Sequence, residues 1–75
     1  MAKLKLGYVG AGYLAQRVHL PNLVNLENIE LVALAEVRPK LAKQVQERFR
    51  IPTLHPDHLA LAKDPNVQAV ALSGH

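Results

Sequence analysis

Residues 5–15 read KLGYVGAGYLA, an apolar, strand-like run that ends in two glycines one residue apart. The glycines fit the pattern G-x-G-x-x-A, placed after a predicted strand and before a predicted helix. Gly10 permits a tight turn, and Gly12 carries no Cβ that would block a pyrophosphate. The free N–H groups around Tyr13 and Leu14 would face that anion with the helix dipole behind them. Taken alone, the stretch fits a phosphate-binding turn or a purely structural strand–helix turn.

Strands and helices are predicted to alternate along the chain. The strands are short apolar runs at residues 3–9, 29–36, 51–54 and 67–72. The helices have apolar residues at helical spacing, at 13–20, 39–50 and 58–63, with a further helical turn beginning at Pro21. Such alternation favours right-handed crossovers and a parallel sheet. We therefore predict an α/β fold, a partial Rossmann-like parallel sheet built as β-α-β-α-β-α-β with strand order 3-2-1-4.

The composition indicates which binding partners and which cellular compartment to expect for this chain. The chain has 75 residues, no cysteine, 4% aromatic residues and a net charge of +3. The absence of cysteine excludes disulfides and thiolate metal sites. The basic residues are scattered and few aromatics accompany them, so we expect no nucleic acid partner. No apolar run approaches the ~18 residues of a transmembrane helix, and no signal-peptide pattern is present, so we expect no membrane association and a cytoplasmic location.

An acidic residue at the end of the second predicted strand strengthens the interpretation as a dinucleotide site. Glu36 lies 24 positions after Gly12, near the spacing of about 20 expected for an acid that binds ribose hydroxyls. A carboxylate there repels a 2′-phosphate, which favours NAD over NADP. Arg38 points the other way, because a guanidinium could pair with a 2′-phosphate or stack on adenine. A solvated residue at the helix start is the alternative for Arg38.

Three longer stretches carry a resemblance to a known family. They are KLGYVGAGYLAQRVHLPNL (5–23), ELVALAEVRPKLAKQVQERFRIP (30–52) and HPDHLALAKDPNVQAVALS (55–73). Together they resemble the N-terminal half of the Gfo/Idh/MocA oxidoreductases, and the resemblance covers essentially the whole chain. It implies a nicotinamide cofactor, NAD or NADP, and hydride transfer to or from a sugar, inositol or related polyol; Glu36 makes NAD the expected cofactor and NADP the alternative.

The resemblance also assigns cofactor-binding residues. They are Gly10, Gly12, Tyr13 and Leu14 along the pyrophosphate, Glu36 and Arg38 at the adenosine ribose, and Ser73 and His75 on the nicotinamide side. Residues 73–75 depart from the family, which commonly has Thr-Pro-Asn or a similar sequence there. The family's catalytic lysine follows a fifth strand and its histidine lies in a substrate domain. Neither region occurs in this sequence, so we assign no catalytic residue and expect the chain alone to be inactive.

These features lead to expectations about organisation and partners. We expect residues 1–75 to form part of a dinucleotide-binding domain, apparently truncated and without a substrate domain, so that a small-molecule substrate binds only a longer form. The last strand is apolar and would lie at a sheet edge, which favours a homo-oligomer or association through that exposed edge. A non-catalytic NAD-binding or sensing module, or a relic that needs a partner chain, is the alternative function. A methyltransferase is disfavoured, because Val9 and Leu14 do not fit its glycine pattern.

Two histidines raise the question of a metal site. His55 and His58 are three residues apart, but Pro56 breaks a helix between them and no third ligand beyond Asp57 is evident. We therefore expect no metal and interpret both histidines as polar loop residues. Asp57 is predicted to cap the helix that follows it, and Asp64 to lie in a turn.

Overall fold

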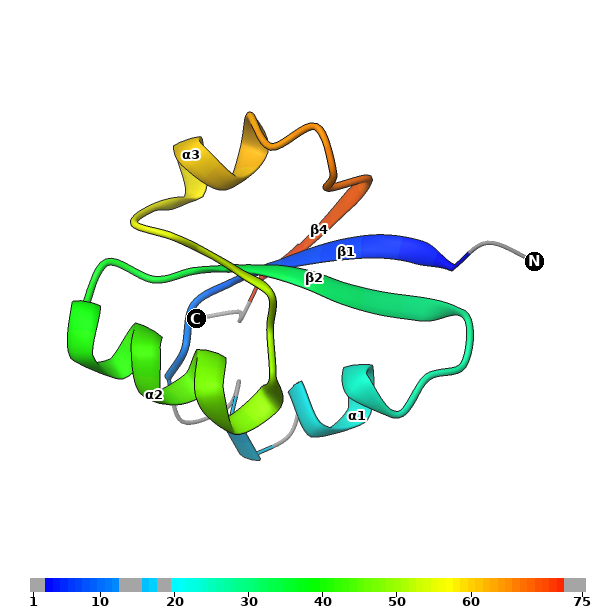
Figure 1. The fold of residues 1–75 in the computed structure, drawn as a ribbon, viewed down its shortest axis with the longest axis horizontal. Coiled ribbons are helices and arrows are strands. Elements are labelled where there is room, and N and C mark those ends of the chain that lie inside the picture. The colour runs from blue at the N-terminus through cyan, green and yellow to red at the C-terminus, as the bar shows by residue number, and fades with distance from the viewer. Residues whose placement is uncertain (1–2, 13–15, 18–19, 73–75) are drawn as a thin grey trace.

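The computed structural model describes residues 3–12, 16–17 and 20–72, which form a parallel sheet with helices on both faces (Figure 1). The elements are β1 (Leu4–Val9), α1 (Leu20–Val24), β2 (Ile29–Ala35), α2 (Pro39–Phe49), β3 (Thr53–His55), α3 (His58–Ala62) and β4 (Ala69–Leu72). The strand order is β3-β2-β1-β4, and every pairing is parallel. The predicted fold class and strand order are therefore confirmed.

Most predicted boundaries differ from the observed ones by at most one residue, and the starts of β3 and β4 differ by two. β3 begins at Thr53 instead of Ile51, because the Ile51 N–H donates to the Gln46 carbonyl at 3.0 Å and so closes the end of α2. β4 begins at Ala69 instead of Val67, because the Val67 N–H donates to the Asp64 carbonyl in the preceding turn. The helical turn expected at Pro21 is α1. Most of the helix expected at 13–20 lies outside the described residues.

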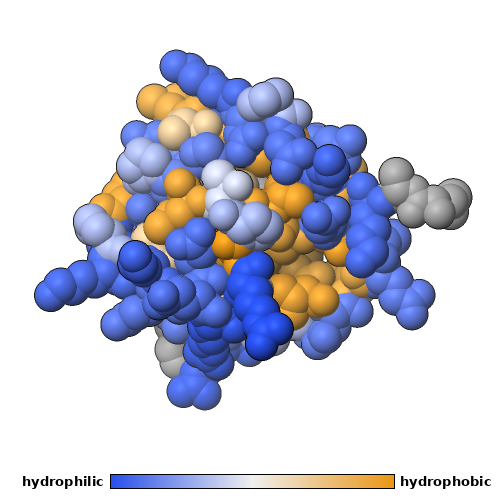
Figure 2. Space-filling view, viewed as in Figure 1, coloured by the Kyte–Doolittle hydropathy of each residue, from blue (hydrophilic) through white to orange (hydrophobic). Residues whose placement is uncertain are grey.

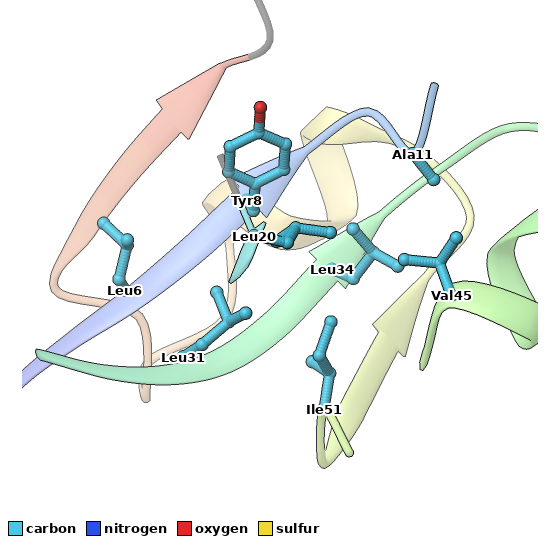
Figure 3. Close-up of a cluster of buried hydrophobic side chains, with 8 residues drawn as sticks. All are labelled: Leu6, Tyr8, Ala11, Leu20, Leu31, Leu34, Val45 and Ile51. Carbon is cyan, nitrogen blue, oxygen red and sulfur yellow. The ribbon is translucent and has the colours of Figure 1, made fainter. Parts of the chain in front are cut away.

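The larger part of the core lies between the sheet and the helices α1 and α2. Side chains from both central strands meet Leu20 of α1 and Val45 of α2 there, and Figure 3 shows them pointing toward one another. A smaller cluster packs Leu61 of α3 against the opposite face of β2. Residues 31–35 are consequently all buried. This cover on both faces explains why β2 is an uninterrupted apolar run.

Gly7 in β1 sets how closely α3 approaches the sheet. A Cβ placed on Gly7 would lie 2.9 Å from Leu61 Cδ2 and 3.1 Å from Val67 Cγ1, which is closer than side chains normally pack. The glycine therefore lets α3 lie directly against β1.

β4 lies at an edge of the described sheet and pairs with β1. Its residues Val70 and Leu72 are 48% and 66% exposed. The expected edge position is thus confirmed, whereas association through that edge stays a prediction.

Polar side chains cover much of the face shown in Figure 2, with smaller apolar areas between them. No helix in the described part of the chain is long and apolar enough to cross a membrane.

Candidate functional site

A cleft opens where the carboxyl ends of β1, β2 and β3 meet. Its volume is about 280 Å³. It is lined by Val9, Gly10, Ala35, Glu36, Val37, Arg38, Asp57 and His58. Open α/β sheets bind ligands outside the carboxyl ends of their strands, so this cleft is the candidate site.

The glycine turn forms one side of the site. Gly10 has a φ of 102°, a conformation that favours glycine, and its N–H donates to the Ala35 carbonyl at 2.8 Å. This bond ties the turn after β1 to the end of β2. Among the described residues, the atom nearest to a Cβ placed on Gly12 is Arg38 Nη2, at 4.0 Å. The turn is therefore unobstructed at Gly12 apart from that side chain.

Glu36 follows β2 directly and lies beside the glycine turn. It is 6% exposed, and its Oε1 accepts the Ala11 N–H at 2.9 Å. Its own N–H donates to the His55 carbonyl at the end of β3, at 3.2 Å. The acid and the turn, separated in sequence, are therefore in direct contact. The spacing of Gly12 and Glu36 predicted that both residues belong to one site, and the bond between Glu36 and Ala11 was not predicted.

The guanidinium of Arg38 binds the same carboxylate through two hydrogen bonds. Its Nε lies 2.8 Å from Glu36 Oε2 and its Nη2 lies 3.0 Å from Oε1, while its backbone N–H donates to Oε2 at 2.9 Å. The Arg38 side chain is 62% exposed, whereas that of Glu36 is 3% exposed. The sequence suggested a solvated residue or a partner for a 2′-phosphate. The ion pair with Glu36 was missed, and only the two-residue spacing hinted at it.

The electrostatics follow from these contacts. The side-chain hydrogen bonds from Arg38 lower the pKa of Glu36 from 4.5 to about 2, against the opposing effect of burial. The backbone hydrogen bonds from Arg38 and Ala11 act in the same direction. Glu36 is therefore ionised at neutral pH, and it is an acceptor of hydrogen bonds only.

The opposite wall of the cleft comes from the start of α3. Asp57 caps this helix, because its Oδ1 accepts the Ala60 N–H at 2.9 Å, which confirms the predicted cap. His58 is exposed and lines the cleft. The sequence offers no specific reason to expect His58 here beyond its position three residues after the end of β3, the strand that neighbours β2.

His55 has a different role from His58. Its Nε2 lies 2.9 Å from Asp64 Oδ2, and this hydrogen bond lowers the pKa of the Asp64 carboxyl. The Asp64 Oδ1 also accepts the Asn66 N–H, as a turn residue does. Within the described residues, no group of three or more possible metal ligands comes together. His55 thus contacts Asp64, whereas His58 lines the cleft.

The other predicted site residues lie outside this description. Tyr13, Leu14, Ser73 and His75 are not among the described residues. The N–H of Gln16 donates to the Gly12 carbonyl at 3.1 Å, and its side chain donates to the Ala11 carbonyl at 2.9 Å. Gln16 therefore braces the glycine turn, a role that its sequence position alone did not indicate.

Comparison with known proteins identifies the family. The family model described as "Oxidoreductase family, NAD-binding Rossmann fold" matches residues 4–74. The chain belongs to the Gfo/Idh/MocA oxidoreductase family. The resemblance noted in the sequence and the expectation of a Rossmann fold are therefore confirmed. The expected class of cofactor agrees with the description of this family.

Two of the proteins that this chain matches are a dehydrogenase and a 3-ketoreductase. Myo-inositol 2-dehydrogenase of Thermotoga maritima is 28% identical over 67 residues, which cover 89% of this chain and 20% of the relative. A structure of KijD10, a 3-ketoreductase from Actinomadura kijaniata in complex with TDP-benzene and NADP, matches with a TM-score of 0.86 and 29% identity. That match covers 96% of this chain and 23% of KijD10.

A second solved structure carries the other nicotinamide cofactor. Myo-inositol dehydrogenase from Lactobacillus casei, in complex with NAD(H) and myo-inositol, matches with a TM-score of 0.85 and 28% identity, over 96% of this chain and 22% of that one. The chain thus spans about a fifth of the length of these relatives. Both NAD(H) and NADP occur among the matched Gfo/Idh/MocA structures.

Proposed function

We propose that this chain binds the adenosine-diphosphate portion of a nicotinamide dinucleotide in the cleft at the ends of β1, β2 and β3. NAD is the preferred cofactor and NADP the alternative. The observation that carries this proposal is the contact between buried Glu36 and the Ala11 N–H, 2.9 Å long. An ionised carboxylate beside a glycine turn supports this proposal, because ribose hydroxyls need such an acceptor and a pyrophosphate needs such a turn.

The glycine turn would hold the pyrophosphate through its backbone. The Ala11 N–H is already bonded to Glu36, so it is not free for the anion. Donors farther along the turn would serve instead, and we assign this role to the N–H groups of Tyr13 and Leu14. Gly10 provides the turn's conformation, and Gly12 leaves the approach open.

The remaining assignments concern the two ends of the dinucleotide. Glu36 would accept hydrogen bonds from the 2′- and 3′-hydroxyls of the adenosine ribose, with Arg38 beside it. Ser73 and His75, which follow β4, would lie toward the nicotinamide. No residue of this chain is assigned a catalytic role.

For the activity, we propose that the domain serves an oxidoreductase that acts on a sugar or polyol. The bound nicotinamide supplies or accepts the hydride. The chain's own residues would bind and orient the dinucleotide, while residues outside these 75 would move the proton of the substrate hydroxyl. The inositol dehydrogenases and the ketoreductase among the relatives support this substrate class.

We also propose that the chain associates through β4, with a second copy as the partner. The support is the exposure of Val70 and Leu72 on a strand whose described pairing is with β1 alone. An apolar strand at a sheet edge is prone to pair with another strand.

We place the folded chain in the cytoplasm, as its sequence suggests.

Calorimetric titration with NAD and NADP tests the binding proposal. Glu36→Gln keeps the shape of the side chain and removes its charge, so we expect NAD affinity to fall about tenfold or more. Glu47→Gln, on the exposed side of α2, is the matched control and should bind as the original chain does. If neither dinucleotide binds a folded sample at millimolar concentration, the proposal is wrong. Unchanged affinity in Glu36→Gln would remove the ribose assignment alone.

A further inference from the structure

The carboxylate of Glu36 is saturated with hydrogen-bond donors. Oε1 accepts the Ala11 N–H and Arg38 Nη2, and Oε2 accepts the Arg38 N–H and Arg38 Nε. A carboxylate offers about four lone-pair positions in all. A ribose hydroxyl can therefore bond to Glu36 only when one of these donors leaves.

The four donors differ in their freedom to leave. Two are backbone N–H groups, held by the glycine turn and by the start of α2. The other two belong to a guanidinium whose side chain is 62% exposed. Long exposed side chains change rotamer readily, whereas the backbone donors move only with the fold. The Arg38 side chain is thus the one exchangeable partner of Glu36 among these donors.

The position of the guanidinium adds a second observation. Arg38 Nη2 lies 3.0 Å from Glu36 Oε1 and 4.0 Å from a Cβ placed on Gly12. It therefore lies close both to the carboxylate and to Gly12. A nucleotide whose pyrophosphate meets the turn and whose ribose meets Glu36 has to pass through this space.

The donor count matches the proposed ligand. The guanidinium contributes two N–H donors to Glu36. The adenosine ribose of NAD contributes two hydroxyl donors, whereas that of NADP, phosphorylated at the 2′ position, contributes one. We infer that Arg38 is an exchangeable latch on Glu36: ribose binding displaces its guanidinium, and the released guanidinium then reduces the preference for NAD by pairing with the 2′-phosphate when NADP binds. This inference rests on the proposed dinucleotide binding and adds the residue that tunes the choice of cofactor.

The interaction between Arg38 and Glu36 affects the binding of NAD and of NADP in opposite directions. With NAD, the bonds between Arg38 and Glu36 are broken and no new anion at the ribose replaces the carboxylate, so the latch opposes binding. With NADP, the guanidinium moves onto a phosphate dianion and keeps a positive charge between that phosphate and Glu36. The same side chain therefore weakens NAD binding and supports NADP binding.

Affinities of Arg38 variants test the latch. We expect Arg38→Ala to bind NAD about threefold to tenfold more tightly and NADP about tenfold or more weakly, because the ion pair and the phosphate partner are both lost. Arg38→Lys keeps the charge without the fork, so it should gain NAD affinity and lose less NADP affinity than Arg38→Ala. Arg50→Ala, an exposed arginine at the other end of α2, is the matched control and should change neither affinity.

The outcomes separate the latch from the binding site itself. If NAD affinity is unchanged or reduced in Arg38→Ala, the latch is refuted while dinucleotide binding stands. If no variant binds either dinucleotide, the proposed function fails and the latch fails with it. Circular dichroism of each variant establishes that the fold is retained.

A spectroscopic readout follows Arg38 directly in the unmutated chain. The Nε–H resonance of Arg38 can be observed by ¹⁵N NMR and assigned by its loss in Arg38→Lys. Saturation with NAD should move it away from its hydrogen-bonded position, and NADP should move it to a different position. A resonance that stays in place at saturation would show that Arg38 keeps its bonds to Glu36, which refutes the exchange.

Discussion

The carboxylate of Glu36 accepts the backbone N–H of Ala11 at 2.9 Å and thereby joins the end of β2 to the turn after β1. This bond is buried, and it connects two segments that the chain separates by the whole of α1. It has consequences for stability as well as for binding.

The first prediction concerns the stability supplied by this bond. Glu36→Ala leaves the buried Ala11 N–H without its acceptor, which should lower the free energy of unfolding by about 1–3 kcal/mol. Urea denaturation followed by circular dichroism measures the change. Glu47→Ala, from the exposed side of α2, should change it by less than about 0.5 kcal/mol. Equal stability of the two variants would contradict the structural role of Glu36.

The second prediction concerns pH. The pKa of Glu36 is about 2 in the folded chain against an ordinary 4.5, so the folded state binds the proton more weakly than the unfolded state. The stabilisation is therefore fully present above pH 4.5 and is lost as the pH falls from 4.5 to 2. It should amount to about 2 kcal/mol once water around the exposed guanidinium is allowed for.

Urea midpoints measured between pH 7 and pH 2 provide the check. The Asp64 pKa is also lowered, so the original chain alone does not isolate Glu36. Glu36→Gln lacks the titrating group, and its stability should fall less steeply across this range than that of the original chain. Parallel pH profiles would contradict the predicted contribution.

The third prediction distinguishes two glycines with different roles. Gly7→Ala places a Cβ 2.9 Å from Leu61, so it should destabilise the fold by about 1–3 kcal/mol through overpacking. Gly12→Ala meets no such contact among the described residues, and it should leave stability within about 0.5 kcal/mol while weakening dinucleotide binding. Thermal unfolding and calorimetry measure the two effects. A Gly12→Ala chain that binds normally would contradict the phosphate role.

The fourth prediction concerns His55 and Asp64. Their contact joins the end of β3 to the turn before β4, and both side chains are largely buried. His55→Ala should therefore lower the free energy of unfolding by about 1–2 kcal/mol. His58→Ala is the matched control, because His58 is exposed and should affect stability little. A larger loss in His58→Ala than in His55→Ala would reverse this assignment.

The fifth prediction addresses association through β4. Val70→Lys adds a charge to the exposed edge strand, so it should reduce self-association without unfolding the chain. Sedimentation velocity over a range of concentrations measures this. Glu30→Lys, on exposed β2 surface, serves as the control. An original chain that remains monomeric at every concentration would contradict the proposed association.

Local pattern was enough to predict the architecture of this protein. Apolar runs and helical periodicity predict the strands and helices, because side-chain period depends only on neighbouring residues. The parallel sheet and the strand order 3-2-1-4 then follow from right-handed crossovers in a doubly wound arrangement. The paired glycines and the acid after the second strand likewise predict two ends of one site. Their spacing requires only that consecutive strands lie side by side.

The tertiary structure decided which partners those site residues have. The fork between Arg38 and Glu36 depends on the direction that two side chains take from the end of β2. The place of His58 in the cleft depends on how closely α3 packs, which in turn depends on Gly7. Sequence periodicity fixes which face a residue occupies, whereas rotamers and packing distances depend on atoms contributed from elsewhere in the chain. The ion pair between Arg38 and Glu36, which most affects the proposed site, therefore became evident only in the tertiary structure.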